Sequence, residues 1–544
     1  MAGKRSIAAL LALVAGGAVA AQPTPSARGR EGGILNVAFS PAAGLDSVDP
    51  ALSFTQPGWS LLDTTCARLF TYPDKPPPAA YRLQPEVVAG WKVSKDFKTY
   101  TFRLRPGFRF SDGKQLQANA FAHAINRVLQ LGSASPGRIF MRDIVGAADV
   151  SAGRARSARG VVARGMRLSV RLTQPAPDFP ARTTLPYFCA VPPGLPASRE
   201  GRGAFPSAGP FYVQEYRENE RVVIRRNPYY DGARKVHLAG FNVDLRGGSP
   251  TQLLRSIDRN EADWGHMISG VFLDSTLDLV RKYGVNQTRF FVRPGLGIRM
   301  LAFNTSRPLF RNNPKLRRAI NFALNRQELL QTSGGPLVSS VTDQHLPYGM
   351  PGFRDARIYP ATGDLARARE LARGHLRDAK AVLYTSDFQL PVLAAQVAAR
   401  QLGQLGLDVT VKPIPDHITS VNYLETLTAR GAAWDIALVL WTPNIPDPHA
   451  YLNLLLEAQL FGGETLPRLQ SRLASAELDR AIGLPQGSAR NRAYAQVDAM
   501  LAREVAPVAP LNVVDEATLV SDRVDPRCIV LRPVLDLAVA CLKD

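Results

Sequence analysis

Short apolar runs alternate with polar segments along most of the chain, and their spacing predicts strands in its first half. The run 34–39 is apolar enough for a buried strand. Within 100–104, Tyr100, Phe102 and Leu104 alternate with polar residues, which predicts a half-buried strand that pairs with another near Trp91. Two further runs, separated by a polar stretch, predict a hairpin; they cover 211–213 and 221–224.

Helices are predicted where apolar residues recur with a period near 3.6. One such stripe covers 121–129, and Asn119 is its predicted N-cap. Another helix is predicted to open with Asn313 as cap and Pro314 in its first turn. Between 145 and 205 the pattern weakens into Arg, Ser, Gly and Pro, so an irregular region or a short-stranded subdomain is expected there.

The clearest unit lies in the second half of the chain. Residues 381–384 predict a strand, 392–405 an amphipathic helix and 409–411 a second strand. The crossover is long enough for parallel strands, so we expect a βαβ unit and an α/β lobe. The run 436–440 has the composition of a further buried strand.

The N-terminal residues are expected to be a targeting segment. A basic pair at 4–5 precedes an apolar stretch that ends in small residues, as in a secretory signal. Cleavage after Ala20 and after Ala21 both fit; we predict a signal peptide at 1–21 and a flexible leader at 22–31. No Cys follows to mark a lipoprotein, and the stretch is shorter than the ~20 apolar residues of a membrane span. A periplasmic or extracellular location is therefore expected.

The composition is strongly basic. The net charge is +20, and arginine dominates among the 66 basic residues. Bands such as Arg154–Arg171 occur, but no zinc-finger, RNA-recognition or basic-zipper pattern accompanies them. We interpret the charge as a solvated surface and expect no nucleic-acid partner, while attraction to anionic envelope polymers stays open.

Four cysteines in an exported chain permit two disulfides. Of the three pairings, we favour Cys528 with Cys541, which bracket a short apolar segment, and this leaves Cys66 with Cys189. Free buried thiols are the alternative. Because closely spaced ligand pairs such as CxxC and HExxH are missing from the sequence, no metal site is predicted.

The local motifs of hydrolases and nucleotide-binding enzymes are also missing. The sequence contains no Gly-x-Ser-x-Gly, and Gly107–Lys114 has the wrong spacing for a phosphate-binding loop. Asp447, between two prolines, is expected to shape a turn. Acids brought together only by folding stay possible. We therefore predict no enzyme activity and no cofactor, and keep a secreted hydrolase as the least favoured alternative.

A series of segments carries a family resemblance. Its densest part runs from Leu83 to Arg127 and includes a Phe-Ser-Asp-Gly turn at Asp112. Shorter segments at 32–35, 48–51, 69–72, 207–212, 226–230, 260–263, 302–305 and 317–324 follow in order. Together they resemble the bacterial extracellular solute-binding proteins of family 5, the oligopeptide-, dipeptide- and nickel-binding group, over roughly residues 32–515.

The resemblance implies a fold and its division. The expected fold is α/β and two-lobed, periplasmic-binding-protein-like of the class II type, with a hinge between the lobes and an extra subdomain on the first. The implied divisions are 32–60, 195–270 and 500–544 for a discontinuous first lobe, 61–194 for the subdomain and 271–499 for the second α/β lobe. The chain would cross the hinge near 265–275 and again near 500.

The resemblance also implies function and partners. A monomeric receptor of a peptide-type ABC importer would enclose a peptide or another small solute between its lobes. It would deliver this ligand to permease subunits, with a separate ATPase supplying the energy, and would contact the membrane only through the permease. A receptor of the same fold for a nickel chelate, an opine or an oligosaccharide is the alternative.

Second-lobe ligand contacts follow from a family motif. Members that hold peptides by the amino end use Trp-x-x-Asp, and the corresponding run here begins with Trp441 and Thr442 and ends with Asn444. An amide accepts a hydrogen bond but carries no charge, which makes a neutral, modified or acidic ligand more attractive. Trp441 could stack on the ligand or fill the core of the lobe.

First-lobe contacts are expected from the loop 54–59, where the resemblance implies ligand contacts through Gln56 and Trp59. An ordinary surface turn around Pro57 and Gly58 is the alternative. Asn304 is expected to anchor the backbone, and Asp112 to shape a structural turn.

Overall fold

The computed structural model describes residues 32–39, 45–201, 203–267, 273–415, 421–443, 445–457, 464–469, 471–531 and 537–544. The predicted signal peptide and leader lie outside these residues, and so does Asn444.

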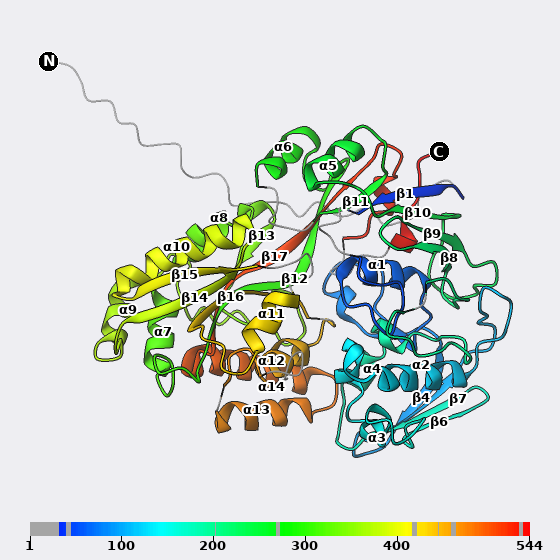
Figure 1. The fold of residues 1–544 in the computed structure, drawn as a ribbon, viewed down its shortest axis with the longest axis horizontal. Helices are drawn as coiled ribbons and strands as arrows, with labels where there is room; N and C mark the ends of the chain where they lie inside the picture. Colours follow the sequence, from blue (N-terminus) through cyan, green and yellow to red (C-terminus); the bar gives the residue numbers. More distant parts are fainter. Residues whose placement is uncertain are drawn as a thin grey trace.

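One mixed sheet of eleven strands runs through the part of the chain that the structure describes (Figure 1). Its order is β15-β14-β16-β12-β17-β11-β1-β10-β9-β8, and β13 pairs with β17 beside this path. The strands are β1 (Ile34–Ala38), β8 (Phe211–Arg217), β9 (Arg221–Arg226), β10 (Gly240–Asp244), β11 (Trp264–Met267), β12 (Phe290–Phe303), β13 (Ser339–Val341), β14 (Lys380–Ser386), β15 (Asp408–Ile414), β16 (Ile436–Trp441) and β17 (Val508–Val520).

The first lobe packs on one end of this sheet. Its core gathers apolar residues from β1, the predicted β8–β9 hairpin and the C-terminal segment, among them Leu35, Phe211 and Leu542. The helices of this end are α1 (Gln56–Thr65), α5 (Pro250–Asp258) and α6 (Leu273–Tyr283). The hairpin prediction is confirmed, because Phe211 pairs with Arg226 in antiparallel register.

A separate subdomain carries a four-stranded antiparallel sheet of order β4-β5-β7-β6. Its elements are β4 (Val88–Val93), β5 (Thr99–Leu104), α2 (Ala118–Leu131), α3 (Ala147–Ser151), β6 (Val161–Arg164), β7 (Arg167–Arg171) and α4 (Phe179–Arg182), beside a small pair β2 (Phe70–Thr71) and β3 (Gln84–Pro85). Trp91 pairs with Phe102, as predicted. The predicted cap Asn119 was wrong: the helix begins at Ala118 after Gln117, whose carbonyl accepts the Ala120 N–H.

The second lobe contains the predicted βαβ unit. β14 and β15 are parallel, and α10 (Gln389–Leu405) connects them. The helix at Pro314 is confirmed, because Asn313 caps it by accepting the Leu316 N–H. The remaining helices are α7 (Pro314–Ala323), α8 (Arg326–Gln331), α9 (Leu365–Ala372), α11 (Val421–Thr428), α12 (Pro448–Glu457), α13 (Arg472–Ile482) and α14 (Ser488–Met500).

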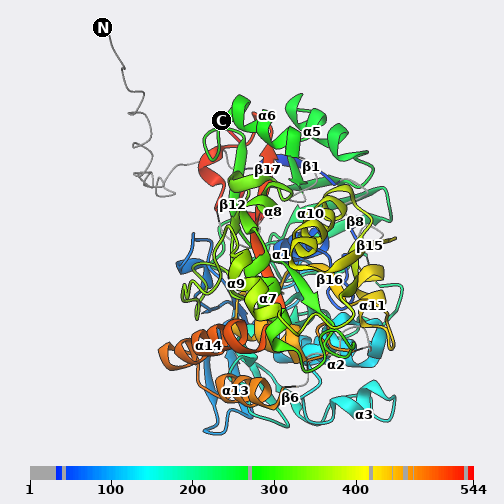
Figure 2. The ribbon, with the colours of Figure 1, turned by 90° about the vertical axis from the view of Figure 1, so that its left-hand side faces the viewer.

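The two lobes are connected through β12 and β17, which lie side by side in Figures 1 and 2. The start of β12 packs with α5 and α6 in a first-lobe cluster that includes Leu279 and Phe290. Its end, at Phe303, packs with second-lobe residues such as Phe310. The domain boundaries stay a prediction, but this packing leads us to propose hinge crossings within β12 and β17, later than 265–275 and 500.

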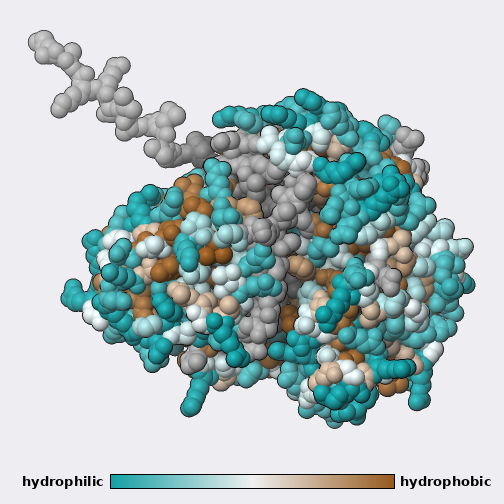
Figure 3. All heavy atoms as spheres, viewed as in Figure 1, coloured by the Kyte–Doolittle hydropathy of each residue, from teal (hydrophilic) through white to brown (hydrophobic). Residues whose placement is uncertain are grey.

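Both cysteine pairs that the spacing favoured are bonded in the structure, Cys66 to Cys189 and Cys528 to Cys541. Hydrophilic side chains dominate both lobes on the face that Figure 3 displays. Within the described ranges, no helix is long and apolar enough to cross a membrane. The same ranges hold no cluster of three or more His, Cys, Asp or Glu side chains suited to a metal ion.

Candidate ligand-binding site

The loop that leads into α1 is organised by one carboxylate. Asp46 accepts hydrogen bonds from the Ser53 and Thr55 hydroxyls at 3.1 and 2.6 Å and from the Phe54 N–H at 2.6 Å. Thr55 then caps the helix by accepting the Gly58 N–H. A Cβ at Gly58 would lie 2.1 Å from the Ser53 hydroxyl oxygen, so only glycine fits. The Pro57-Gly58 step is therefore the first turn of a helix.

Gln56 is the first residue of α1, and its exposed side chain reaches β17. Its amide nitrogen donates to the Glu516 carboxylate of β17 at 2.8 Å. The other oxygen of Glu516 forms an ion pair with Arg293 of β12, which is almost fully buried. Gln56 therefore lies where the two connecting strands meet the first lobe.

Trp59 lies one turn further along α1 and is partly buried. Its indole N–H donates to the Ser53 carbonyl at 2.8 Å, and its ring packs edge-on against Tyr187 with the centroids 5.9 Å apart. These contacts use the polar atom of Trp59 and one side of its ring. They support the helix and leave the predicted ligand contact of Trp59 untested.

The second-lobe side of the site is the end of β16. Trp441 is its last residue, pairs with Ile298 of β12 and donates its indole N–H to the Ala450 carbonyl at 3.2 Å. The ring is partly buried and packs against the lobe core. Thr442 is exposed, and Asn444 lies outside the described residues. A ligand role for these three residues stays a prediction.

Glycines lie where the pairing of the two connecting strands is interrupted, at the hinge position proposed above. The pairing of β12 with β17 is interrupted between Arg293 and Gly297, where a bulge shifts the register. A Cβ at Gly295 would lie 1.8 Å from the Val514 carbonyl oxygen. The Gly295 N–H donates to Asp515, and burial raises the pKa of that carboxyl.

Gln56 and Trp441 thus approach the same strand from opposite lobes. Gln56 is linked through Glu516 to Arg293, and Trp441 pairs five positions further along β12, at Ile298. Because of the bulge, Arg293 and Ile298 lie opposite Glu516 and Val513, which are only three positions apart on β17, or roughly 10 Å at about 3.3 Å per residue.

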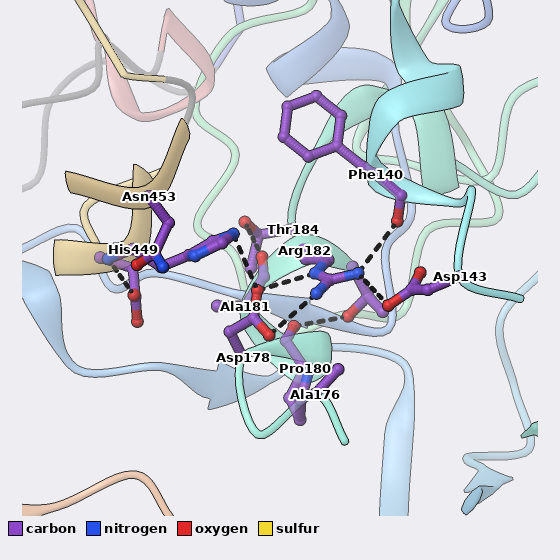
Figure 4. Close-up of polar contacts among 12 residues, drawn as sticks. Phe140, Asp143, Ala176, Asp178, Pro180, Ala181, Arg182, Thr184, His449 and Asn453 are labelled. Atoms are coloured by element: carbon purple, nitrogen blue, oxygen red, sulfur yellow. Dashed lines mark hydrogen bonds and ion pairs between the residues drawn. The ribbon is translucent and has the colours of Figure 1, made fainter. Parts of the chain in front are cut away.

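A second contact between the lobes lies away from the hinge, between the subdomain and α12 (Figure 4). Buried Arg182 binds Asp178 through two nitrogens, at 2.7 and 3.0 Å, and Asp143 at 2.8 Å. His449 of the second lobe comes within 3.7 Å of Asp178. Burial alone would raise the pKa of Asp178, but Arg182 and His449 outweigh it and hold that pKa well below the usual range.

A second ion pair lies beside this contact. Asp447 accepts two hydrogen bonds from Arg490, at 2.7 and 3.0 Å, and one from the His449 N–H at 2.9 Å. Asp447 thus shapes the expected turn and also neutralises a buried arginine. Burial raises the pKa of Asp447, but Arg490 outweighs it and the net pKa is lowered. Burial lowers the pKa of His449, against the attraction of Asp178.

Two cavities flank this contact. One, of about 370 Å³, is lined by charged and amide groups that include Arg142, Gln174 and Asp479. The other, of about 460 Å³, is lined by aromatic rings that include Phe70 and Trp91. Both lie between the subdomain and the second lobe, so the interface between the lobes contains cavities on either side of this contact.

Several residues around the candidate site are brought there by contacts with residues that are distant in the sequence. Sequence reasoning missed Glu516 and Arg293, because neither stands in a motif and they are 223 positions apart. It missed Asp178 and His449 for the same reason. Two local expectations are in accord with the structure: Asp112 accepts the Lys114 N–H in a turn, and buried Asn304 donates to the Trp434 carbonyl.

Comparison with known proteins identifies the family. The profile of the bacterial extracellular solute-binding proteins, family 5, matches residues 82–462. The chain is 24% identical to the probable D,D-dipeptide-binding periplasmic protein DdpA of Escherichia coli over 493 residues, which cover 86% of each chain. It is 25% identical to the probable deoxycholate-binding periplasmic protein YgiS of the same organism, over 79% of this chain and 80% of that one.

Solved structures share the fold. The clavulanic acid biosynthesis oligopeptide binding protein 2 superimposes with a TM-score of 0.82 at 22% identity, over 96% of this chain and 97% of that one. The two-lobed α/β architecture is therefore that of known binding proteins. The profile match covers well over half of the sequence, and this chain belongs to family 5 of the bacterial extracellular solute-binding proteins.

Proposed function

We propose that this protein is the extracytoplasmic receptor of a peptide-type ABC importer. It captures a small solute between its two lobes and delivers it to a membrane permease. The observation that carries the proposal is the hinge: two strands of one continuous sheet join the lobes, and a glycine bulge interrupts their pairing. Members of the family and the similar structures are binding proteins.

Closure around ligand would be a population shift between open and closed arrangements. Gln56 from the first lobe and Thr442 from the second are exposed, polar and adjacent to the hinge strands. The contact of Asp178 with His449 would form only when the lobes approach. A permease could then distinguish the loaded receptor from the empty one by its shape.

The ligand class rests on the site's charges. A relative named for D,D-dipeptide binding supports a peptide. Asn444 in place of the family's carboxylate, and a relative named for deoxycholate binding, favour a second candidate in which the solute lacks a free ammonium group. We propose the peptide class for the transporter, with a modified or N-blocked peptide as its ligand.

A thermal-shift screen tests the receptor function. The panel holds free-amine peptides, N-acetylated peptides, bile acids, oligosaccharides, opines and nickel chelates, and native mass spectrometry gives the stoichiometry of each hit. A ligand at a hundredfold excess over its Kd should raise the free energy of unfolding by about 2.7 kcal/mol. Turnover of a substrate without a stable complex for any solute would overturn the proposal.

A paired variant tests the location of the site. Gln56→Ala should weaken binding of the identified ligand about tenfold. The variant loses the amide that is predicted to contact the ligand, and it removes the hydrogen bond that holds the Glu516 carboxylate in place. Gln404→Ala, at an exposed position near the end of α10, is the matched control and should bind like the wild type. Equal affinities for both variants would place the ligand away from α1.

A further inference from the structure

The outer face of the subdomain sheet is a second functional candidate. α2 and neighbouring residues bury the inner face, to which Phe102, Leu104 and Leu168 contribute. Successive side chains of a strand point to opposite faces, so Arg103 of β5 and Arg167 of β7 project from the other side. Both are exposed.

The strand register aligns cations on this outer face. Arg103 lies directly opposite Arg167, and Arg167 lies directly opposite Arg164 of β6, which makes a row of three arginines across adjacent strands. Lys92 of β4 lies in the next row, opposite Thr101, and Arg171 pairs with Thr99 one row further. All five cations are exposed. We call them the cationic face.

Among the described strand positions of this face, none is acidic. Among the described residues, none of its five cations has a carboxylate within ion-pair distance, whereas arginines elsewhere in the subdomain, such as Arg154 and Arg182, do. Like charges directly opposite one another destabilise a sheet, so the row costs stability. The segment 88–171 carries 16 basic and 4 acidic residues, hence +12 of the chain's +20.

We propose that the cationic face docks the receptor on an anionic phospholipid membrane. The face is two-dimensional: strands about 4.8 Å apart spread the three arginines over about 10 Å, and long side chains let each reach a different headgroup. Guanidinium groups bind phosphate oxygens through paired hydrogen bonds. An extracytoplasmic family makes a lipid surface a better fit than a nucleic acid.

This inference goes beyond the proposed function and revises the expectation that membrane contact occurs only through the permease. A receptor held near the bilayer by charge would meet a membrane partner more often, without any apolar insertion. Because the attraction is electrostatic, it should weaken as ionic strength rises and the Debye length falls from about 30 Å at 0.01 M to about 8 Å at 0.15 M.

Vesicle co-sedimentation tests the proposal. The purified protein is mixed with vesicles of phosphatidylglycerol and phosphatidylcholine in equal parts, or of phosphatidylcholine alone, at low and at high NaCl. We expect binding to the anionic vesicles only, and less of it in salt. The variant R103Q/R164Q/R167Q should bind about a hundredfold more weakly, since each cation near an anionic surface contributes about fivefold.

A charge-matched control separates the face from the overall charge. R373Q/R430Q/R472Q removes three exposed arginines of the second lobe and should bind vesicles nearly as well as the wild type. Equal losses in both variants, or no binding of wild-type protein to anionic vesicles, would overturn the proposal. Retention on heparin without vesicle binding would also overturn it, because the occupant would then be an anionic polymer.

Ligand stabilisation in the thermal-shift assay serves as the independent readout. Both triple variants should fold and respond to the identified ligand like the wild type, because the substitutions lie on exposed positions away from the hinge. Failure of membrane binding would therefore leave the receptor function standing. A missing ligand response in all proteins would contradict the receptor function alone.

Discussion

At the residue scale, the contact between the lobes depends on how buried charges are matched. His449 is packed among Asp178 and Arg182 of the subdomain and Asp447 and Arg490 of its own lobe. Asp143 also pairs with Arg182. Asp178 and Asp447 attract a proton on the imidazole, but burial disfavours the charged form more strongly. Burial thus favours neutral His449, in agreement with its lowered pKa.

This arrangement predicts a pH effect on stability. A folded pKa below the unfolded value of about 6.5 means that the unfolded chain binds the proton more readily, so the contribution of His449 is present above pH 6.5 and is lost as pH falls. The loss is at most about 1.4 kcal/mol per pH unit. His449→Gln should flatten this part of the pH dependence, measured by urea unfolding at pH 7, 6 and 5.

The wild type and His449→Gln share all their other titrating groups. The difference between their plots of unfolding free energy against pH therefore isolates the contribution of His449. Parallel pH dependences in the wild type and His449→Gln would show that the imidazole does not resist protonation. The variant keeps an amide that can lie against Asp178, which limits the damage to packing.

At the element scale, the bulge in β12 places the proposed hinge in a few residues around Gly295. Gly295→Ala should destabilise the protein by about 1–3 kcal/mol, because the added methyl group would overlap the Val514 carbonyl of β17. Gly403→Ala is the matched control, since nothing lies within 4 Å of that position in α10, and it should stabilise by about 0.5–1 kcal/mol. Thermal unfolding measures the stability change of both variants. Equal changes in the two variants would mean that β12 and β17 separate easily at Gly295.

The two disulfides constrain chain segments of different lengths. Cys66–Cys189 closes a separation of 123 residues and ties the end of α1 to the subdomain, whereas Cys528–Cys541 closes only 13. The loop-entropy estimate is about 5 kcal/mol for the longer loop and about 3 for the shorter. Denaturant unfolding of the two double alanine variants should rank them in that order, and the reverse order would show that native-state packing outweighs loop length.

At the scale of the whole molecule, the net charge of +20 predicts self-repulsion that salt relieves. Raising NaCl from 0.01 to 0.15 M should increase Tm, because screening reduces repulsion among exposed arginines more than it weakens buried pairs such as Arg490 with Asp447. Differential scanning calorimetry in both buffers measures the change. A Tm that falls with salt would mean that attractive surface ion pairs dominate.

Local sequence patterns predicted the main helices and strands, and the family resemblance predicted the fold class. Periodicity identified the βαβ unit of the second lobe, and Asn313 with Pro314 marked the start of α7. Both signals depend only on residues that are close together in the sequence. The prediction of Asn119 as the cap was wrong because several polar residues near Ala118 are possible N-caps. The backbone hydrogen bonds of the folded helix show that Gln117 occupies the cap position.

Which distant residues meet depends on the folded chain as a whole. Gln56 finds Glu516 across 460 positions, and Asp178 approaches His449 from another lobe, and neither pairing leaves a local pattern. Strand register likewise aligns Arg103, Arg164 and Arg167, which the sequence shows only as scattered arginines. Chain periodicity follows from backbone geometry that each residue carries with it, whereas sites arise from pairings that packing of the whole chain selects.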